Sequence, residues 1–182
     1  MKSLKIPTPE TVDKAVANMP RLEQQRYFFA RLQNPHWIEP LSGKGFFSKP
    51  PEGIKHEAEG TIEVQVWPAS QYLSRMATLA PAEVCEVLAR MPETQNPFVV
   101  RDFIEAALAM PPDIADKLST KISKLIKTHL LIASNKAGDL AVKLSRAGER
   151  HGALTILRSL LEVVPDPRPI SDELKRLNPK YG

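Results

Sequence analysis

Apolar residues recur every three or four positions along much of the chain, the spacing of one face of an α-helix. In Asn96–Met110, for example, the apolar stripe contains Val99, Phe103 and Ile104, and Arg101 lies opposite. The same spacing predicts helices over Arg21–Gln33, Ala82–Met91, Asp113–Leu130, Asn135–Ala147 and Arg150–Val164. Helices of this length with narrow apolar faces are marginal alone in water, so we expect them to pack on one another.

Prolines stand where the predicted helices begin or end. Thr8-Pro9 begins a first helix that ends near Met19-Pro20, Asn96-Pro97 begins another, and Pro111-Pro112 separates two more. Proline is tolerated at the first helical position because that N–H has no partner within the helix. Gly148 follows the Asn135–Ala147 helix and is expected to end it as a C-terminal cap.

The spacing of the predicted helices favours a repeat architecture. Alternate helices begin about 31 to 39 residues apart, which is the range of paired-helix repeats of the armadillo and HEAT kind. Ala30–Leu32 followed by Asn34-Pro35 also recurs as Ala89–Met91 followed by Asn96-Pro97. We therefore predict an all-α fold of paired antiparallel helices, stacked as a short HEAT/armadillo-like α-solenoid with one long irregular loop.

Gly43–Trp67 interrupts the helical pattern with glycine, proline and mixed charge. Within it, Thr61–Trp67 alternates as a strand would, but no partner strand is evident. We expect an extended wall laid against the helices, or alternatively disorder over Lys49–Gly60. A single domain is predicted, made of N-terminal helices (1–43), the irregular loop (44–67), stacked helix pairs (68–164) and a tail (165–182).

Composition is that of a globular chain, with 42% hydrophobic and 25% charged residues among 182. No apolar run approaches the roughly 20 residues that span a bilayer, and the basic start Met1–Pro7 lacks the apolar region of a signal peptide. The single cysteine, Cys85, cannot form an intrachain disulfide, which fits a reducing compartment. We expect a cytoplasmic protein without membrane contact.

Positive charge is concentrated between Pro111 and Arg150, a stretch that contains eight Lys/Arg and only four Asp/Glu. Within this basic stretch, Lys117, Lys121 and Lys124 have the spacing of one helix face, here called the lysine ridge. The candidate contacts to a nucleic acid or an acidic partner are Lys117, Lys121, Lys124, Lys127, Lys143, Arg146 and Arg150. The alternative is an ordinary solvated helix surface.

Catalytic and metal-binding signatures are missing from the sequence. Ser42–Gly45 departs from a phosphate-binding loop, which needs an earlier glycine and a Ser/Thr after the lysine, so a turn is expected there. The four histidines are far apart, and His129 continues an apolar stripe, which favours a core position. Cys85 lies on an apolar face, where cysteine behaves as a small hydrophobe. We predict no enzyme activity, no cofactor and no metal.

Aromatic residues gather in the N-terminal part, with eight of eleven between Tyr27 and Tyr72. They can form a groove for a peptide or a stacked base. They can equally form a bulky core, which the scarcity of nearby lysine and arginine favours.

Asn34–Leu41, Gly45–Phe47, Pro50-Pro51 and Trp67–Ala77 resemble helical-repeat regions of large, mostly uncharacterised bacterial proteins. Some proteins of that kind contain ATPase or nuclease domains and are associated with anti-phage defence. The resemblance implies an architecture, and one segment of a longer polypeptide, but no active-site residues. The ending at Asn178–Gly182 shows no obvious capping helix, which agrees with that expectation.

Two functions follow from these patterns. The first is a non-catalytic scaffold, because stacked helix pairs present long surfaces that bind proteins or other domains of their own chain. The second is nucleic-acid binding along the lysine ridge and its basic neighbours.

Overall fold

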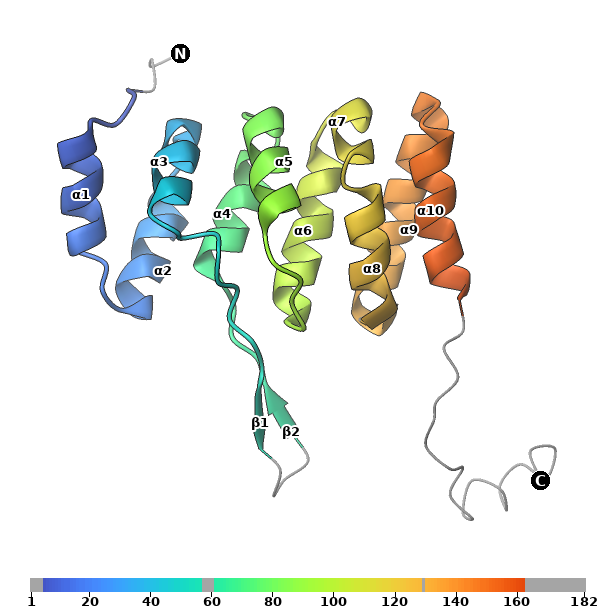
Figure 1. Cartoon of the computed structure of the whole chain (residues 1–182), viewed down its shortest axis with the longest axis horizontal. Coiled ribbons are helices and arrows are strands. Elements are labelled where there is room, and N and C mark those ends of the chain that lie inside the picture. Colours follow the sequence, from blue (N-terminus) through green and yellow to red (C-terminus); the bar gives the residue numbers. More distant parts are fainter. Residues whose placement is uncertain (1–4, 57–60, 129, 163–182) are drawn as a thin grey trace.

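The computed structural model describes residues 5–56, 61–128 and 130–162, and the fold within these ranges is helical (Figure 1). One short hairpin interrupts the helices. The elements are α1 (Pro9–Ala17), α2 (Leu22–Arg31), the 3₁₀ helix η1 (Pro35–Trp37), α3 (Ile38–Gly43), β1 (Ile54–His56), β2 (Thr61–Glu63), α4 (Pro68–Met76), α5 (Pro81–Arg90), α6 (Pro97–Ala109), α7 (Pro112–Asp116), α8 (Ser119–Thr128), α9 (Leu130–Ala147) and α10 (Arg150–Leu161). The predicted all-α class is confirmed.

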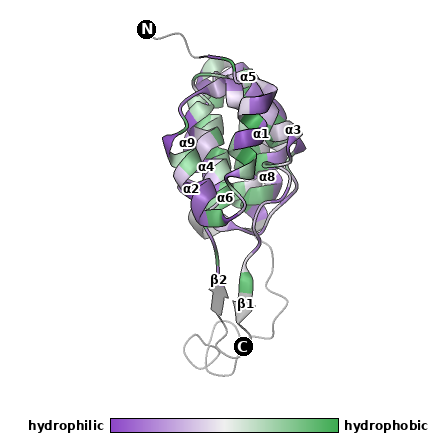
Figure 2. Cartoon of the chain, turned by 90° about the vertical axis from the view of Figure 1, so that its left-hand side faces the viewer, coloured by the Kyte–Doolittle hydropathy of each residue, from purple (hydrophilic) through white to green (hydrophobic). Residues whose placement is uncertain are grey.

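The helices stand side by side in two layers (Figure 1). The front layer holds α1, α3, α5, α7 with α8, and α10, and each packs against the next. The rear layer holds α2, α4, α6 and α9, which also pack in that order. The chain thus alternates between the layers as it advances. Seen from one end, the layers lie back to back and the hairpin extends beyond them (Figure 2).

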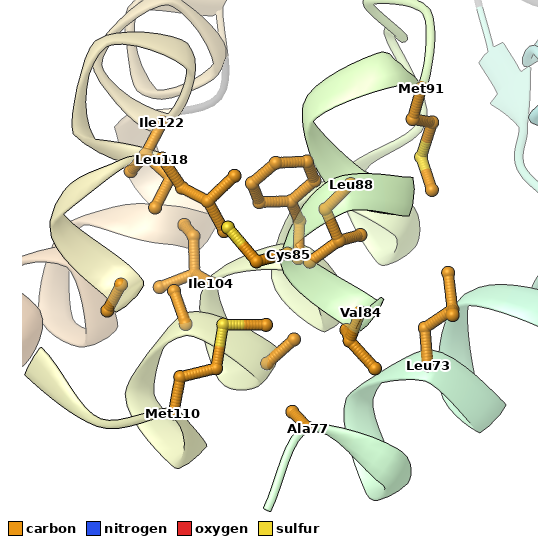
Figure 3. Packing of buried hydrophobic residues seen from close by; sticks show 14 of the residues in the cluster. Leu73, Ala77, Val84, Cys85, Leu88, Met91, Ile104, Met110, Leu118 and Ile122 are labelled. Carbon is orange, nitrogen blue, oxygen red and sulfur yellow. The ribbon is translucent and has the colours of Figure 1, made fainter. Parts of the chain in front are cut away.

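The hydrophobic core runs between the layers along the row. Leu73 of α4, Val84 and Leu88 of α5, Ile104 of α6 and Leu118, at the junction before α8, point into this core (Figure 3). The predicted stripe of the Asn96–Met110 helix is buried within this core. Its phase in the sequence was therefore predicted correctly.

Helix ends follow the local signals in the sequence. Proline occupies the first turn of α1, η1, α4, α5, α6 and α7. Asn96 caps α6, because its side chain accepts hydrogen bonds from the backbone N–H groups of Phe98 and Val99. Gly148 has a φ of 92° after α9, the left-handed conformation expected of a C-terminal cap.

The predicted helix over Asp113–Leu130 is instead two helices, α7 and α8. At the junction the N–H groups of Lys117 and Leu118 bond to carbonyls three residues back, which tightens the chain into a turn. The Ser119 hydroxyl also donates to Asp116 Oδ1 at 3.2 Å across this junction. The next helix, α9, begins at Leu130, five residues earlier than the apolar pattern indicated.

The expectation of an unpartnered strand was wrong. Thr61–Glu63 pairs antiparallel with Ile54–His56, with Ile54 opposite Glu63 and His56 opposite Thr61. The hairpin extends away from the helix row and is not a wall along it (Figure 1). A three-residue strand is too short to show alternation, which is why the partner was missed. The suggested disorder over Lys49–Gly60 does not hold for Ile54–His56, and residues 57–60 lie outside the described part.

The internal match between the two Asn-Pro segments reflects a shared cap. Asn34 accepts a hydrogen bond from the His36 N–H at 3.1 Å and begins η1, which leads into α3 of the front layer. Asn96 begins α6, which belongs to the rear layer. The two segments therefore occupy different places in the alternation of the layers. What they share is the local Asn-Pro cap of a helical turn, and not a position in a repeat.

Two helical glycines are expected to respond to alanine with opposite signs. At Gly138 of α9 an added Cβ meets nothing within 4 Å, so Gly138→Ala should stabilise the fold by about 0.5–1 kcal/mol. At Gly152 of α10 a Cβ would overlap Asp116 Oδ1 and Ser119 Oγ, so these hydrogen-bonded side chains would have to move. Gly152→Ala should therefore lower the melting temperature, and a rise matching Gly138→Ala would show that α10 does not pack this closely.

Candidate interaction surfaces

The three lysines of the lysine ridge line one groove, although they come from two elements. Lys117 is the C-cap of α7, and Lys121 and Lys124 belong to α8. All three line a groove of about 370 Å³ between α5 and α8, with Glu93 on its opposite wall. The structure thus brings the three lysines to one groove, although not on the single helix face that their spacing predicted.

The side chain of Lys121 is hydrogen-bonded to the protein's own backbone. Its ammonium donates to the carbonyl oxygens of Leu88 at 2.8 Å and Ala89 at 3.0 Å, and also to that of Met91. These carbonyls end α5 and lack partners within the helix, and the negative end of the helix dipole lies there. Burial lowers the pKa of Lys121, nearby Lys124 lowers it further, and Glu93 opposes the shift.

The same arrangement recurs elsewhere in the row. Lys143 of α9 donates to the carbonyl oxygen of Leu108 at 2.7 Å and to that of Met110, at the end of α6. Arg75 of α4 donates to the Phe29 carbonyl at 2.6 Å, near the end of α2. In each case a cation caps the C-terminus of an earlier helix in its own layer. Lys121, Lys143 and Arg75 are therefore called the capping cations.

Two other basic candidates, Lys124 and Lys127, are paired with acids. Lys124 lies 3.6 Å from Glu93, and Lys127 lies 2.6 Å from Glu162. Lys136, in the same stretch, is paired with Glu105. Lys117, Arg146 and Arg150 make no ion pair among the described residues. Lys143, Arg146 and Arg150 belong to α9 and to the start of α10, apart from the lysine ridge.

Asn96 has a second role that the sequence did not indicate. It is fully buried, and its Nδ2 donates to the carbonyl oxygens of Pro51 and Gln65, each at 2.8 Å. These carbonyls lie on the two arms that lead into and out of the hairpin. The Gln95 N–H also donates to Glu52 Oε2 at 3.1 Å. The start of α6 therefore holds the root of the hairpin.

Asp102 is a buried carboxylate between α6 and α4. The Ser70 hydroxyl lies 2.7 Å from its Oδ2, and the Arg101 guanidinium lies 3.0 Å from its Oδ1. Burial raises the pKa of Asp102, although hydrogen bonds from Ser70 and Arg101 oppose the shift. Ser70 is in the first turn of α4, so the pair ties that helix start to α6. This is a structural contact, since both side chains are buried.

The weaker chemical candidates have structural explanations. Lys44 follows α3 in a turn, pairs with Asp13 at 2.5 Å, and precedes Gly45 with a φ of 81°. Cys85 is buried against the Ile114 carbonyl, and burial raises the pKa of its thiol, although Lys117 lowers it in part. His129 lies outside the described residues. Among those described, no group of His, Cys, Asp or Glu side chains could hold a metal ion.

Most of the aromatic residues between Tyr27 and Tyr72 form core. Phe29 is buried at the centre of the cluster, with ring centroids of Phe28, Phe46 and Tyr72 within 5.8 Å of its own. Tyr27 is the exposed member, and the Arg31 guanidinium lies 4.4 Å from its ring centroid. The core interpretation of these aromatics holds, with Tyr27 as the exception.

An apolar groove of about 600 Å³ lies between α1 and α2, at the start of the helix row. Met19, Tyr27, Phe28 and Leu32 supply its apolar lining, and Glu23 and Arg31 supply charge. At the other end of the row, α10 exposes Leu154, Leu157 and Leu161. Tyr27 and Phe28 belong to the aromatic residues for which the sequence left a peptide or base groove open, whereas the sequence pattern did not indicate the exposed face of α10.

No family model, curated protein or solved structure matches this chain. In the part of the chain that the structure describes, every helix is too short or too polar to cross a membrane.

Proposed function

We propose that this chain is a non-catalytic scaffold, a short HEAT/armadillo-like α-solenoid that binds a protein or another domain of its own polypeptide. The alternation of the helices between two layers supports the solenoid, because the helices pack on their neighbours in the same layer and on helices of the other layer. The argument for a scaffold rests on two features of the surface: the partners of its basic side chains and the exposure of its apolar side chains.

The observation that carries the proposal is that most of the basic side chains of the basic stretch already have partners within the protein. Lys121 and Lys143 each satisfy carbonyl groups at the end of another helix, and Lys124 and Lys127 face carboxylates. A phosphate would have to compete with these internal partners. Positive charge in this stretch is thus better explained by helix packing than by a ligand.

Exposed apolar side chains support protein contacts. Tyr27 is on α2 at one end of the row, and Val142 and Leu154 are on α9 and α10 at the other. Exposed apolar surface of this kind is typical of sites that bind other proteins.

A photo-crosslinking amino acid at Tyr27 tests the scaffold function in cells that express the native gene. We expect one discrete protein adduct, which Phe28→Asp should remove because it places a charge in the same groove. The matched control carries the crosslinker at Arg90, an exposed position on α5, and should give no such adduct. Equal labelling from both positions would contradict a specific contact at the groove.

Nucleic-acid binding remains the alternative, and Lys117 and Lys124 carry it because their ammonium groups do not cap helices. Fluorescence anisotropy with duplex DNA and RNA at 150 mM salt should give dissociation constants near 10⁻⁴ M or weaker, roughly the non-specific range. Lys117→Glu with Lys124→Glu should leave that value unchanged. A micromolar affinity that this double variant abolishes would replace the scaffold by a nucleic-acid binder.

A further inference from the structure

The exposed side of α10, at the end of the helix row, carries an apolar stripe that no described element covers (Figure 1). Leu154, Leu157 and Leu161 are 52%, 39% and 80% exposed, and their spacing places them on one side of the helix. Val142 of α9, which packs on α10, is 49% exposed. A single exposed leucine is ordinary, but a stripe along a whole helix is typical of a surface that binds another protein.

The spacing of this stripe is that of the seam between two helices that pack side by side. Apolar residues separated alternately by three and four positions form the seam of coiled coils and helix bundles. Leu157 is the middle residue of the stripe, so the stripe offers nearly the same contacts in both directions from it. In a second α10 that runs in the opposite direction, with its Leu157 at the same level, Leu161 lies within about 1.5 Å of the level of Leu154.

The charges at the two ends of α10 also favour an antiparallel neighbour. The first turn contains Arg150 and His151 and no acid, although acids are the favourable charges at the start of a helix. Arg150 makes no ion pair among the described residues. Glu162 is the C-cap of the same helix, and it stays half-exposed although it pairs with Lys127, so it can accept further donors.

An antiparallel copy of α10 brings these opposite charges together. In the arrangement that places the two Leu157 side chains at one level, Glu162 of the copy lies within about 3 Å of the level of Arg150 and His151. The negative end of the second helix dipole lies beside the same two basic groups. Arg158 flanks the stripe near its middle, and its side chain is long enough to keep the guanidinium in solvent beside its counterpart.

Both the apolar stripe and the charged ends of α10 match themselves after a two-fold rotation, and such self-complementarity is the requirement for an interface between two copies of one chain. We propose that α10 is the interface of a symmetric homodimer, in which two copies of this helix pack antiparallel through Leu154, Leu157 and Leu161. The groove beside Tyr27 is at the opposite end of the row, so in the dimer it stays open to the partner of the proposed scaffold.

Light scattering of the full chain tests the interface, and we expect the mass of two chains. Leu157→Asp should raise the dimer dissociation constant at least about thirtyfold, because it places a charge at the centre of the seam. Leu79→Asp is the matched control, since Leu79 is 60% exposed in the turn before α5, and it should leave the dimer intact. Both variants should keep the helical circular dichroism of the parent, because the substituted side chains are exposed.

Disulfide trapping tests the antiparallel arrangement. Leu157→Cys should cross-link to itself on oxidation, because it lies beside the two-fold axis. Leu161→Cys should not, since its two copies are about 12 Å apart along the helix axis, which is farther than a disulfide reaches. A mixture of Leu154→Cys chains and tagged Leu161→Cys chains should cross-link again. Cys85 is buried and should not contribute.

Three results would overturn the proposal. A monomer at every protein concentration would exclude a second copy as the occupant of the stripe. A dimer that Leu157→Asp leaves intact would lie on another surface. Cross-linking of Leu161→Cys to itself, without the mixed product, would show that the two helices are not antiparallel. None of these results bears on the groove beside Tyr27, whose crosslinking test concerns the other end of the row.

Discussion

Phe103→Ala should lower the free energy of unfolding by about 3–5 kcal/mol, the range for removing a phenylalanine from a packed core. The ring is only 2% exposed in the middle of α6, which packs on α4 in its own layer and on α5 and α8 of the front layer. It also lies 5.8 Å from the Lys121 ammonium, which caps α5. The loss should therefore loosen both layers together.

Urea unfolding followed by helical circular dichroism measures this effect, and the melting temperature should fall by about 10 °C. Phe98→Ala is the matched control, because Phe98 lies on the same helix but is only half-buried beside Arg101. Phe98→Ala should lower the free energy of unfolding clearly less than Phe103→Ala does. Equal costs at the two positions would mean that the assigned face of α6 does not point into the core.

Asn96→Ala should lower the free energy of unfolding by about 3 kcal/mol, which is a large effect for a polar residue. The variant loses the cap of α6, typically worth about 1 kcal/mol, and leaves the partly buried carbonyls of Pro51 and Gln65 without their donor. Amide exchange in β1 and β2 should also accelerate, because the root of the hairpin is released.

Asn34→Ala is the matched control for this second prediction. Asn34 also caps a helical turn before proline, but it is less buried, and its Nδ2 donates to a single carbonyl, that of Lys5. It should cost about 1 kcal/mol and leave hairpin exchange unchanged. Asn96→Asp separates the two roles of Asn96, since a carboxylate can cap α6 but cannot donate to the hairpin. Normal exchange in the hairpin of Asn96→Asp would contradict the proposed restraint.

Local signals in the sequence determined most of the helices. Apolar spacing located α6 and the phase of its buried face, and proline marked the starts of α1 and α6. Gly148 marked the end of α9. These features were predictable because a helix is defined by hydrogen bonds and side-chain neighbours within about four residues, so the causes lie within a short window of sequence.

The tertiary structure decided the features that depend on distant partners. The break after α7 places Asp116 and Ser119 against Gly152 of α10, and the periodicity of α8 contains no sign of this contact. No local pattern connects these two segments. The pairing of β1 with β2 was missed for a different reason: the two strands are neighbours in the chain, but β1 is too short to show a strand pattern.

The candidate site shows the same division. The sequence placed Lys117, Lys121 and Lys124 on one surface, and they do line one groove. Their separate uses could not be predicted, because Lys121 bonds to carbonyls some thirty residues away and Asn96 bonds to the arms of the hairpin. A lysine on a polar helix face looks the same in sequence whether it faces solvent or another helix end. Only packing brings those carbonyls within reach, and it thereby turns a surface charge into a structural contact.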